Sequence, residues 1–197
     1  TLKLFMTTWT VLTAFAAIGT QSRGALLGMS AMALFVWINS RRKLMSGIIV
    51  VVTGACIAAL MPEAWYERMG TIKTHDEDAS AQGRVNAWWT SFNMAKDRLM
   101  GGGFECWQSP TFALYAPDPD NVRDVHSVTF EVLGEHGFIG LALFLTLGLM
   151  TWFSAGWAAR QARKMPDIHW VADMMRMVQV SLIAYAVAGQ FLGMAYY

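Results

Sequence analysis

Five long apolar blocks constrain the fold of this chain more than any other feature of its sequence. They cover about residues 4–18, 25–38, 44–61, 138–157 and 177–195 of a chain that is 55% hydrophobic. A helix crosses a bilayer with about 20 mostly apolar residues, and lipid cannot satisfy the polar groups of an irregular backbone. The blocks therefore predict membrane-spanning helices, the second block being short for a span.

A polar island separates the third block from the fourth and covers residues 62–137. It holds most of the acidic residues, together with Arg84, His126 and three consecutive glycines at positions 101–103. The net charge of the whole chain is +1, so no strong positive field favours nucleic acid as a partner. An island held between membrane helices is where we expect the chemistry of such a protein.

Clusters of basic residues predict how the chain is oriented in the membrane. One cluster lies between the second and third blocks, at residues 41–43, and another lies between the fourth and fifth, at residues 160–176. Cytoplasmic loops carry an excess of Lys and Arg, so the island falls on the opposite side. The sequence predicts an all-α, polytopic transmembrane helix bundle. Membrane helices lie in residues 1–61 and 138–197, and a large loop on the outer side, with amphipathic helices, lies in residues 62–137.

Apolar residues recur every three or four positions in the island between Val85 and Leu99. The spacing predicts an amphipathic helix over about residues 84–100, capped by Ser80 and ended by Gly101. Its tryptophan-rich face is expected on the membrane surface or against the bundle. The pattern also predicts a second helix, which starts at His126 and runs into the fourth block.

Three side chains on the predicted outer side could carry chemistry, namely Arg23, Arg84 and His126. Guanidinium groups bind phosphate through planar, bidentate hydrogen bonds. A histidine can take a proton from an attacking hydroxyl because imidazole titrates near neutral pH. The trio therefore suits a lipid-linked phosphate or pyrophosphate. Plainer interpretations stay open: a snorkelling or helix-end Arg23, an Arg84 paired with Glu77, Asp78 or another acid of the island, and a His126 that caps a helix or is a satisfied interfacial histidine.

Other motifs of the island have simpler interpretations. The glycine run at 101–103 lacks the Gly-Lys-Ser/Thr of a Walker loop, so it is a helix stop and hinge or a place of close approach to a ligand. Asp118-Pro119-Asp120 is similar to a metal-binding Asp-x-Asp motif, but its prolines favour a surface turn. No zinc pattern is present, and the two cysteines are predicted to be free thiols. Counted along a helix from His126, Glu131 and Glu135 point away from the face of the histidine. They either are solvated or pack between helices as carboxylates, or they orient His126 or bind sugar hydroxyls.

The run that begins at His126 resembles a signature of the O-antigen ligase and polymerase superfamily. In that family a His-Asn pair precedes two spaced glutamates and a Gly-x-x-Gly at the entry to a membrane helix. Here Glu131, Glu135 and the Gly-x-x-Gly at 137–140 follow His126 in the same order. Ser127 stands where the family commonly has Asn, which puts the role of that position in doubt.

Upstream motifs agree with the same family. Ser22-Arg23-Gly24 follows a membrane block, and Gly83-Arg84 precedes Trp88 and then Gly101 and Gly103. The family has roughly twice as many membrane spans, so the chain resembles its C-terminal half and would need N-terminal spans as a partner. It also resembles the exosortase-associated O-glycosylation ligase subgroup.

The resemblance implies a multi-pass protein of the bacterial inner membrane with its active site on the periplasmic face. The activity would be a glycosyltransferase that needs no metal or other cofactor. Its donor would be a glycan on undecaprenyl pyrophosphate, and its acceptor a hydroxyl of lipid A core or of a protein. Arg23 and Arg84 would hold the pyrophosphate and His126 would activate the acceptor. Four further residues would contact the substrates: Trp88, Gly103, Ser127 and Glu131.

Two rival functions stay open from the sequence. An O-antigen polymerase would use the same donor to join glycan repeat units, and nothing in the residues separates it from a ligase. A non-enzymatic membrane transporter or sensor would show ionisable residues or broken helices within its spans. The first, third and fourth blocks carry no acid or base between their ends, which favours the enzyme.

Overall fold

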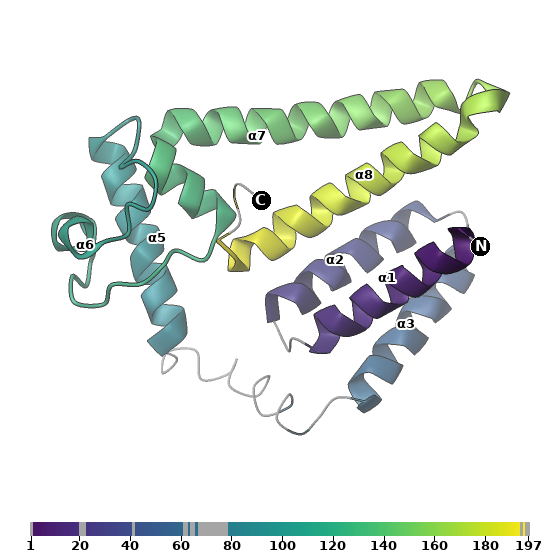
Figure 1. Ribbon diagram of the computed structural model, residues 1–197, viewed down its shortest axis with the longest axis horizontal. Helices are drawn as coiled ribbons and strands as arrows, with labels where there is room; N and C mark the ends of the chain where they lie inside the picture. The colour runs from purple at the N-terminus through teal and green to yellow at the C-terminus, as the bar shows by residue number, and fades with distance from the viewer. Residues whose placement is uncertain are drawn as a thin grey trace.

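The fold is known from a computed structural model, which describes residues 2–19, 23–40, 42–60, 63, 66, 79–193 and 195. Every regular element among them is a helix (Figure 1), which confirms the all-α prediction for this part of the chain. The α-helices are α1 (Leu2–Gly19), α2 (Arg23–Asn39), α3 (Lys43–Leu60), α5 (Ala79–Asp97), α6 (Ser109–Tyr115), α7 (Val128–Ala162) and α8 (His169–Ala188). Two short 3-10 turns, η2 (Pro166–Ile168) and η3 (Gly189–Phe191), flank α8.

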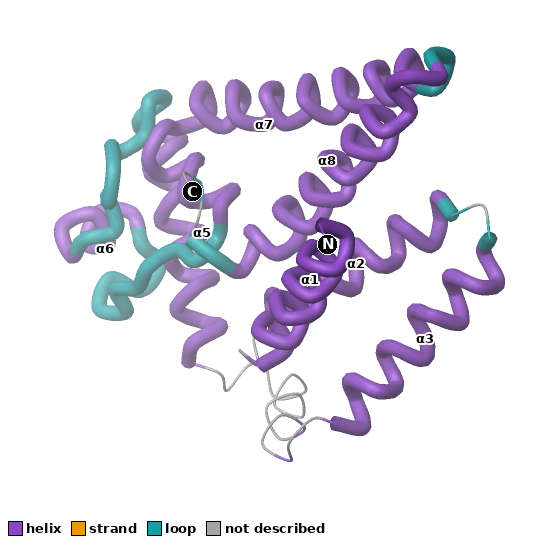
Figure 2. Tube along the Cα trace, turned by 45° about the vertical axis from the view of Figure 1, so that its right-hand side comes forward, coloured by secondary structure: helices purple, strands orange, loops and turns teal. Residues whose placement is uncertain are grey.

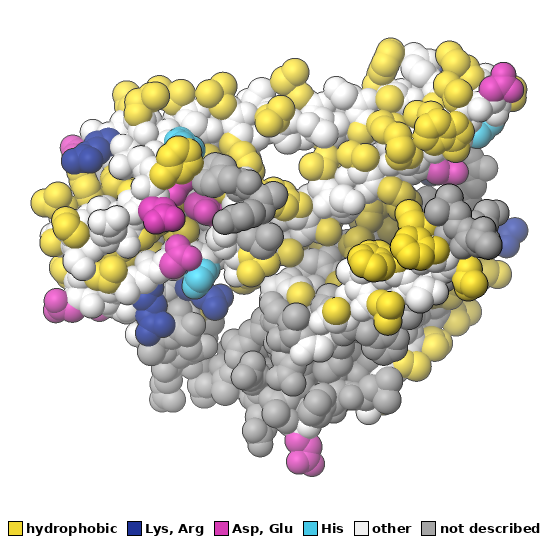
Figure 3. Space-filling view, in the orientation of Figure 1, with side chains coloured by type: hydrophobic (Ala, Val, Ile, Leu, Met, Phe, Trp, Pro, Cys, Tyr) yellow, Lys and Arg dark blue, Asp and Glu magenta, His cyan; other side chains and the backbone are white. Residues whose placement is uncertain are grey.

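Two helical stretches in the described part of the chain are long and apolar enough to cross a membrane. They are Val128–Ala162 and Pro166–Phe191, with mean hydropathies of 1.9 and 1.4. Shorter apolar stretches lie in Gly24–Asn39 and Lys43–Cys56. Figure 3 shows hydrophobic side chains along much of the visible face of α7 and α8, as expected for surfaces that lipid covers. A bundle of five spans with a periplasmic loop stays a prediction, as does the division at residues 62 and 138.

Small residues pack the start of α2 against the end of α8. A Cβ atom on Gly24 would come within 2.9 Å of a side-chain carbon of Phe191, and one on Gly28 within 2.9 Å of Ala188. Small residues let helix backbones approach closely in membrane bundles. The contact with Phe191 places the backbone of Arg23 beside η3, the short turn that follows α8. The fifth apolar block was predicted to run to about residue 195, but α8 ends at Ala188 and η3 ends at Phe191.

A kink at Gly137 divides α7 into a short first part and a long second part, which Figure 1 shows pointing in different directions. The backbone of Gly137 has φ 64° and ψ −166°, a combination that is essentially restricted to glycine. The glycine run after α5 lies against the first part, because Gly102 N–H donates to Gly134 O at 2.8 Å and Gly103 N–H to Glu135 O at 3.0 Å. The run therefore joins the segment that follows α5 to the first part of α7 (Figure 2), whereas the predicted helix stop and hinge are not seen there, since α5 already ends at Asp97.

The polar island folds around a small core of its own, formed by Ala87, Phe112 and Val125. The two adjacent tryptophans of α5 lie in different surroundings. The ring of Trp88 stacks on Phe130 with centroids 5.0 Å apart, whereas Trp89 is 51% exposed. Trp88 therefore packs against α7, as one of the two predicted locations of the tryptophan-rich face requires, and the placement of Trp89 on a membrane surface stays a prediction.

The bounds of two helices also differ from their predictions. Ser80 lies inside α5 and does not precede it, and α5 ends at Asp97, before the predicted stop. The helix predicted from His126 begins at Val128, with Ser127 in extended backbone at its N-cap. His126 is therefore not a helix cap, and that interpretation is wrong.

Candidate functional site

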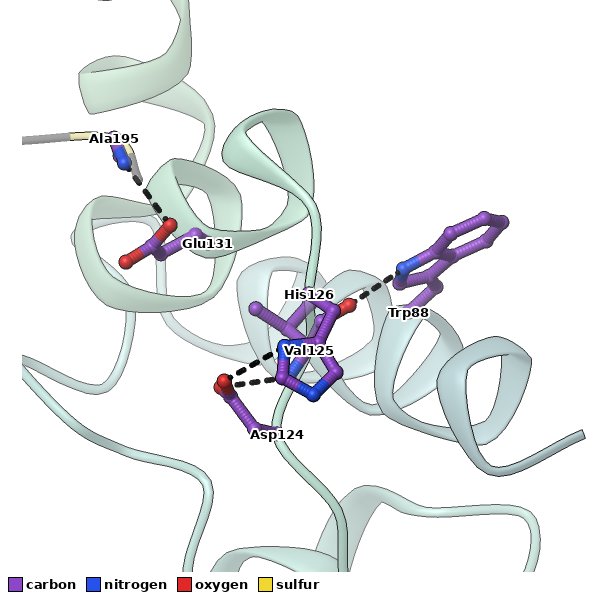
Figure 4. A network of polar contacts seen from close by, with 6 residues as sticks. All are labelled: Trp88, Asp124, Val125, His126, Glu131 and Ala195. Carbon is purple, nitrogen blue, oxygen red and sulfur yellow. Dashed lines mark hydrogen bonds and ion pairs between the residues drawn. The ribbon is translucent and has the colours of Figure 1, made fainter. Parts of the chain in front are cut away.

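The backbone of His126 has an unusual conformation in the extended segment that leads into α7. Its φ is 42°, in the left-handed region that costs a residue other than glycine of order 1–3 kcal/mol. Its neighbours hold it there, since Val125 and Ser127 are both buried. The indole N–H of Trp88 donates to Val125 O at 2.9 Å, as Figure 4 shows. Backbone strain of this kind is frequent at functional sites.

Asp124 orients the imidazole of His126. Its Oδ2 atom lies 3.1 Å from His126 Nδ1, while both side chains stay about half exposed. An Nδ1–H that donates to a carboxylate leaves Nε2 as the free base of the ring. The sequence prediction missed Asp124, because a spacing of two residues brings the carboxylate and the ring together only in this backbone conformation.

The guanidinium of Arg84 is incompletely bonded. Its Nε atom is buried, and no hydrogen-bond partner for it exists in the part of the chain that the structure describes. Arg84 lies on α5 one turn before Trp88, the residue that bonds to Val125 beside His126. The alternative partners Glu77 and Asp78 lie outside the described residues. A buried donor without an acceptor costs about 1–3 kcal/mol, so an anion that accepts from it would be held.

Glu131 lies on the first turn of α7 and faces the end of the chain. Its Oε2 accepts a hydrogen bond from Ala195 N–H at 3.1 Å, shown in Figure 4. A Cβ atom on Gly193 would lie 3.6 Å from that oxygen and 3.5 Å from Asp124 Oδ2. Two carboxylates therefore converge on one place, although helical spacing counted from His126 predicted that Glu131 points away. The reason is that residue 126 is not helical.

The surroundings of Glu131 make it a weaker acid than usual. Glu131 precedes the kink at Gly137 and so belongs to the polar island. Burial raises its pKa, and the negative charges of Glu135 and Asp124 raise it further, while the N–H of Ala195 opposes the shift. A carboxyl with a raised pKa can serve as either a donor or an acceptor toward a sugar hydroxyl.

Glu135 and Cys106 form a buried polar pair behind the glycine run. Glu135 Oε1 accepts from Glu105 N–H at 2.8 Å, and Oε2 has no partner among the described residues. Burial, together with the charge of Glu135, raises the pKa of the Cys106 thiol to about 12. Both cysteines are free, as predicted. Glu135 therefore fixes the loop between α5 and α6.

Ser127 and Gly103 have structural contacts of their own. Ser127 is buried, and its hydroxyl donates to Gln190 Oε1 in η3 at 3.4 Å. Gly103 has φ 85°, with open space where a Cβ atom would stand. Their substrate contacts stay predictions, and for Ser127 the structure offers a different role, that of joining α7 to the end of α8.

The structure brings three of the predicted site elements to one end of the molecule. Trp88 joins α5, which carries Arg84, to the segment of His126 and Asp124. Ser127 joins that segment to η3, and η3 lies against the start of α2 at Gly24. Arg23 is the first residue of α2, and its side chain is outside the described part. Figure 3 shows acidic, basic and histidine side chains gathered on this side of the molecule.

The described residues contain no group of three or more His, Cys, Asp or Glu side chains that could hold a metal ion. Asp118 and Asp120 lie in an exposed turn, as predicted, and Asn86 accepts from Asp118 N–H at 2.9 Å. Metal independence itself stays a prediction.

A comparison with protein families relates this arrangement to known proteins. A family model described as O-antigen ligase matches residues 9–145. No curated protein and no solved structure matches the chain, and the exosortase-associated subgroup stays a prediction. The family match covers more than half of the chain and includes Arg23, Arg84, His126 and Glu131. The chain therefore belongs to the O-antigen ligase family.

Proposed function

We propose that the protein is a metal-independent glycosyltransferase of the bacterial inner membrane, with its site on the periplasmic face. It moves a glycan from undecaprenyl pyrophosphate to a hydroxyl of lipid A core or of a protein. The observation that carries the proposal is the buried Nε of Arg84, which has no partner among the described residues and lies on the helix that Trp88 joins to the His126 segment. Family membership supports a lipid-linked glycan donor in general.

In the proposed reaction the acceptor hydroxyl attacks the anomeric carbon of the donor sugar. The bond between that carbon and the phosphate oxygen breaks, and undecaprenyl pyrophosphate leaves with the bonding electrons. His126 Nε2 takes the hydroxyl proton, while Asp124 holds the ring through Nδ1. Arg84 and Arg23 stabilise the negative charge that develops on the pyrophosphate.

The acceptor would lie beside the carboxylates of Asp124 and Glu131, next to Gly193, which fills the space between them. Carboxylates accept hydrogen bonds from sugar hydroxyls, so the pair suits a glycan acceptor such as lipid A core. The same geometry also fits the growing glycan of a polymerase. Transfer assays with each acceptor class distinguish the two.

Replacing Arg84 by alanine in the full-length protein is expected to lower transfer from an undecaprenyl-pyrophosphate glycan by about 10²–10³-fold, because a charge-stabilising donor is lost. Arg84→Lys keeps the charge but not the buried Nε donor, so it should recover only part of the rate. Product would be followed by gel mobility of the glycosylated acceptor, with and without EDTA.

Arg98→Ala is the matched control for this experiment. Arg98 follows the same helix and its guanidinium lies over the ring of Tyr115, 6.0 Å from its centroid. Its removal should leave transfer within about twofold, the range of ordinary surface changes. Normal transfer by a folded Arg84→Ala protein would refute the assignment, and loss of transfer in EDTA would refute metal independence.

Asp124 is predicted to act as a positioning residue through His126. Asp124→Ala should lower kcat by about 10–100-fold, because a misplaced catalytic group loses its alignment, with KM for the donor nearly unchanged. Asp124→Glu should recover part of kcat, since its carboxylate can still reach Nδ1. A rise in the KM for the donor without a change in kcat would show that Asp124 binds the donor and does not orient His126.

A further inference from the structure

The loop that follows α5 exposes large apolar side chains. Leu99, Met100 and Phe104 are 62%, 69% and 71% exposed. They stand on the polar island, whose other large apolar residues include the buried Phe112 and Val125. Adjacent exposed apolar side chains mark a surface that another phase or molecule covers.

Backbone and ring contacts fix the position of this loop along α7. The backbone of Gly137 lies directly against the carbonyl of Leu99, so that a Cβ atom there would overlap it. The ring of Phe104 lies 5.0 Å from the ring of His136 in an edge-on contact. The loop therefore sits beside the kink of α7, immediately before Phe138.

The kink is also where the apolar part of α7 begins. Residues 138–162 extend roughly 37 Å at 1.5 Å per residue, enough to cross a hydrocarbon core of about 30 Å. Leu143, Leu147 and Phe153 on this part are each about two-thirds exposed. A span of this length places residue 138 at the boundary between hydrocarbon and head groups, and the loop beside it lies at the same level.

Aromatic and basic neighbours of the loop fit that boundary. The ammonium group of Lys96 lies 5.1 Å from the ring of Phe92, which contacts Phe138 edge-on at 6.0 Å. Aromatic residues and snorkelling Lys and Arg side chains are typical of the membrane–water interface. Figures 1 and 2 both show α5 running across the direction of the long part of α7, and therefore along such a surface.

We propose that residues 99–104 are an interfacial anchor that inserts Leu99, Met100 and Phe104 among the membrane lipids. The anchor holds the end of α5 on the outer surface of the bilayer. Because α5 runs along that surface, Arg84 at its other end stays at the level of lipid head groups. The inference requires only that α7 crosses a membrane, so it stands or falls separately from the proposed transfer reaction.

Spin-label accessibility tests the anchor in the full-length protein. Nitroxides would be attached at Met100→Cys or Phe104→Cys, in nanodiscs and in a background with Cys56→Ser and Cys106→Ala. Leu114→Cys is the matched control, because Leu114 is 72% exposed but lies on α6, across α5 from the long part of α7 (Figures 1 and 2). The measured quantity is the ratio of collisions with oxygen to collisions with a water-soluble nickel chelate.

The ratio at positions 100 and 104 is expected to be at least about threefold higher than at 114, since side chains of interfacial segments lie about 5–10 Å into the boundary. Equal ratios at all three positions would show that the loop faces water. Low collision rates with both probes at 100 and 104 would show that protein covers the loop, either further spans or a second copy. Either of these two results would overturn the proposal.

Discussion

Replacing His126 by asparagine is expected to lower glycan transfer by about 10²–10⁴-fold, the contribution typical of a positioned general base. Asparagine accepts the left-handed backbone at this position more readily than most residues, so the segment between Val125 and Ser127 should keep its shape. The amide cannot take the proton of the acceptor hydroxyl. The measurements are kcat of the full-length protein and its thermal unfolding midpoint in detergent.

His169→Asn is the control, since His169 begins α8 at an exposed position, far along the chain from the site. It should change neither quantity. A folded His126→Asn protein with normal kcat would eliminate His126 as the base. A lower unfolding midpoint would instead assign His126 a structural role that its strained backbone does not suggest.

Replacing Gly137 by alanine is expected to destabilise the fold by about 3–5 kcal/mol, from strain of the backbone and overlap with a neighbour. The added Cβ would meet the carbonyl of Leu99, and neither backbone can withdraw without breaking the contact between α5 and α7. Transfer should fall with the folded fraction, because α5 carries Arg84. Chemical unfolding in detergent, with helix content as the signal, measures the effect.

Two other glycines separate the causes of this effect. Gly103 also has a positive φ but has nothing within 4 Å of its Cβ position, so Gly103→Ala should cost only about 1–2 kcal/mol. Gly148 lies in the same helix as Gly137 with open space around it, so Gly148→Ala should stabilise by up to about 1 kcal/mol. Equal stability of the three variants would mean that the kink is not fixed by Gly137.

Local patterns in the sequence predicted where the helices lie better than they predicted which residues pack against each helix. Periodicity places α5 and the apolar helices, because a helix repeats every 3.6 residues whatever lies around it. It could not show that Trp88 packs inside on Phe130, since that depends on a residue 42 positions away. Nor could it show that the hydroxyl of Ser127 donates a hydrogen bond to Gln190. These are tertiary contacts, which single-chain spacing does not encode.

The candidate site was predictable in its residue types and less so in its geometry. Arg84 and His126 follow from the need for a cation and a base on one side of the membrane. The carboxylates at Asp124 and Glu131 converge only because the backbone turns at residue 126. A helix starting at His126 would have pointed Glu131 elsewhere. The sign of one backbone angle therefore decided which acids belong to the site.

The close contact between α2 and α8 acts as a spacer for the site. Gly24 against Phe191 and Gly28 against Ala188 leave no room for a further side chain, so the width of that seam is set by the glycine backbone on one side and the side chains of Phe191 and Ala188 on the other. Arg23 stands at one side of the seam, and Gln190, bonded to Ser127, stands at the other. A methyl group added at residue 24 or 28 would push the start of α2 away from η3. The spacing between Arg23 and His126 in the proposed site would then change, although neither residue 24 nor residue 28 carries a functional group.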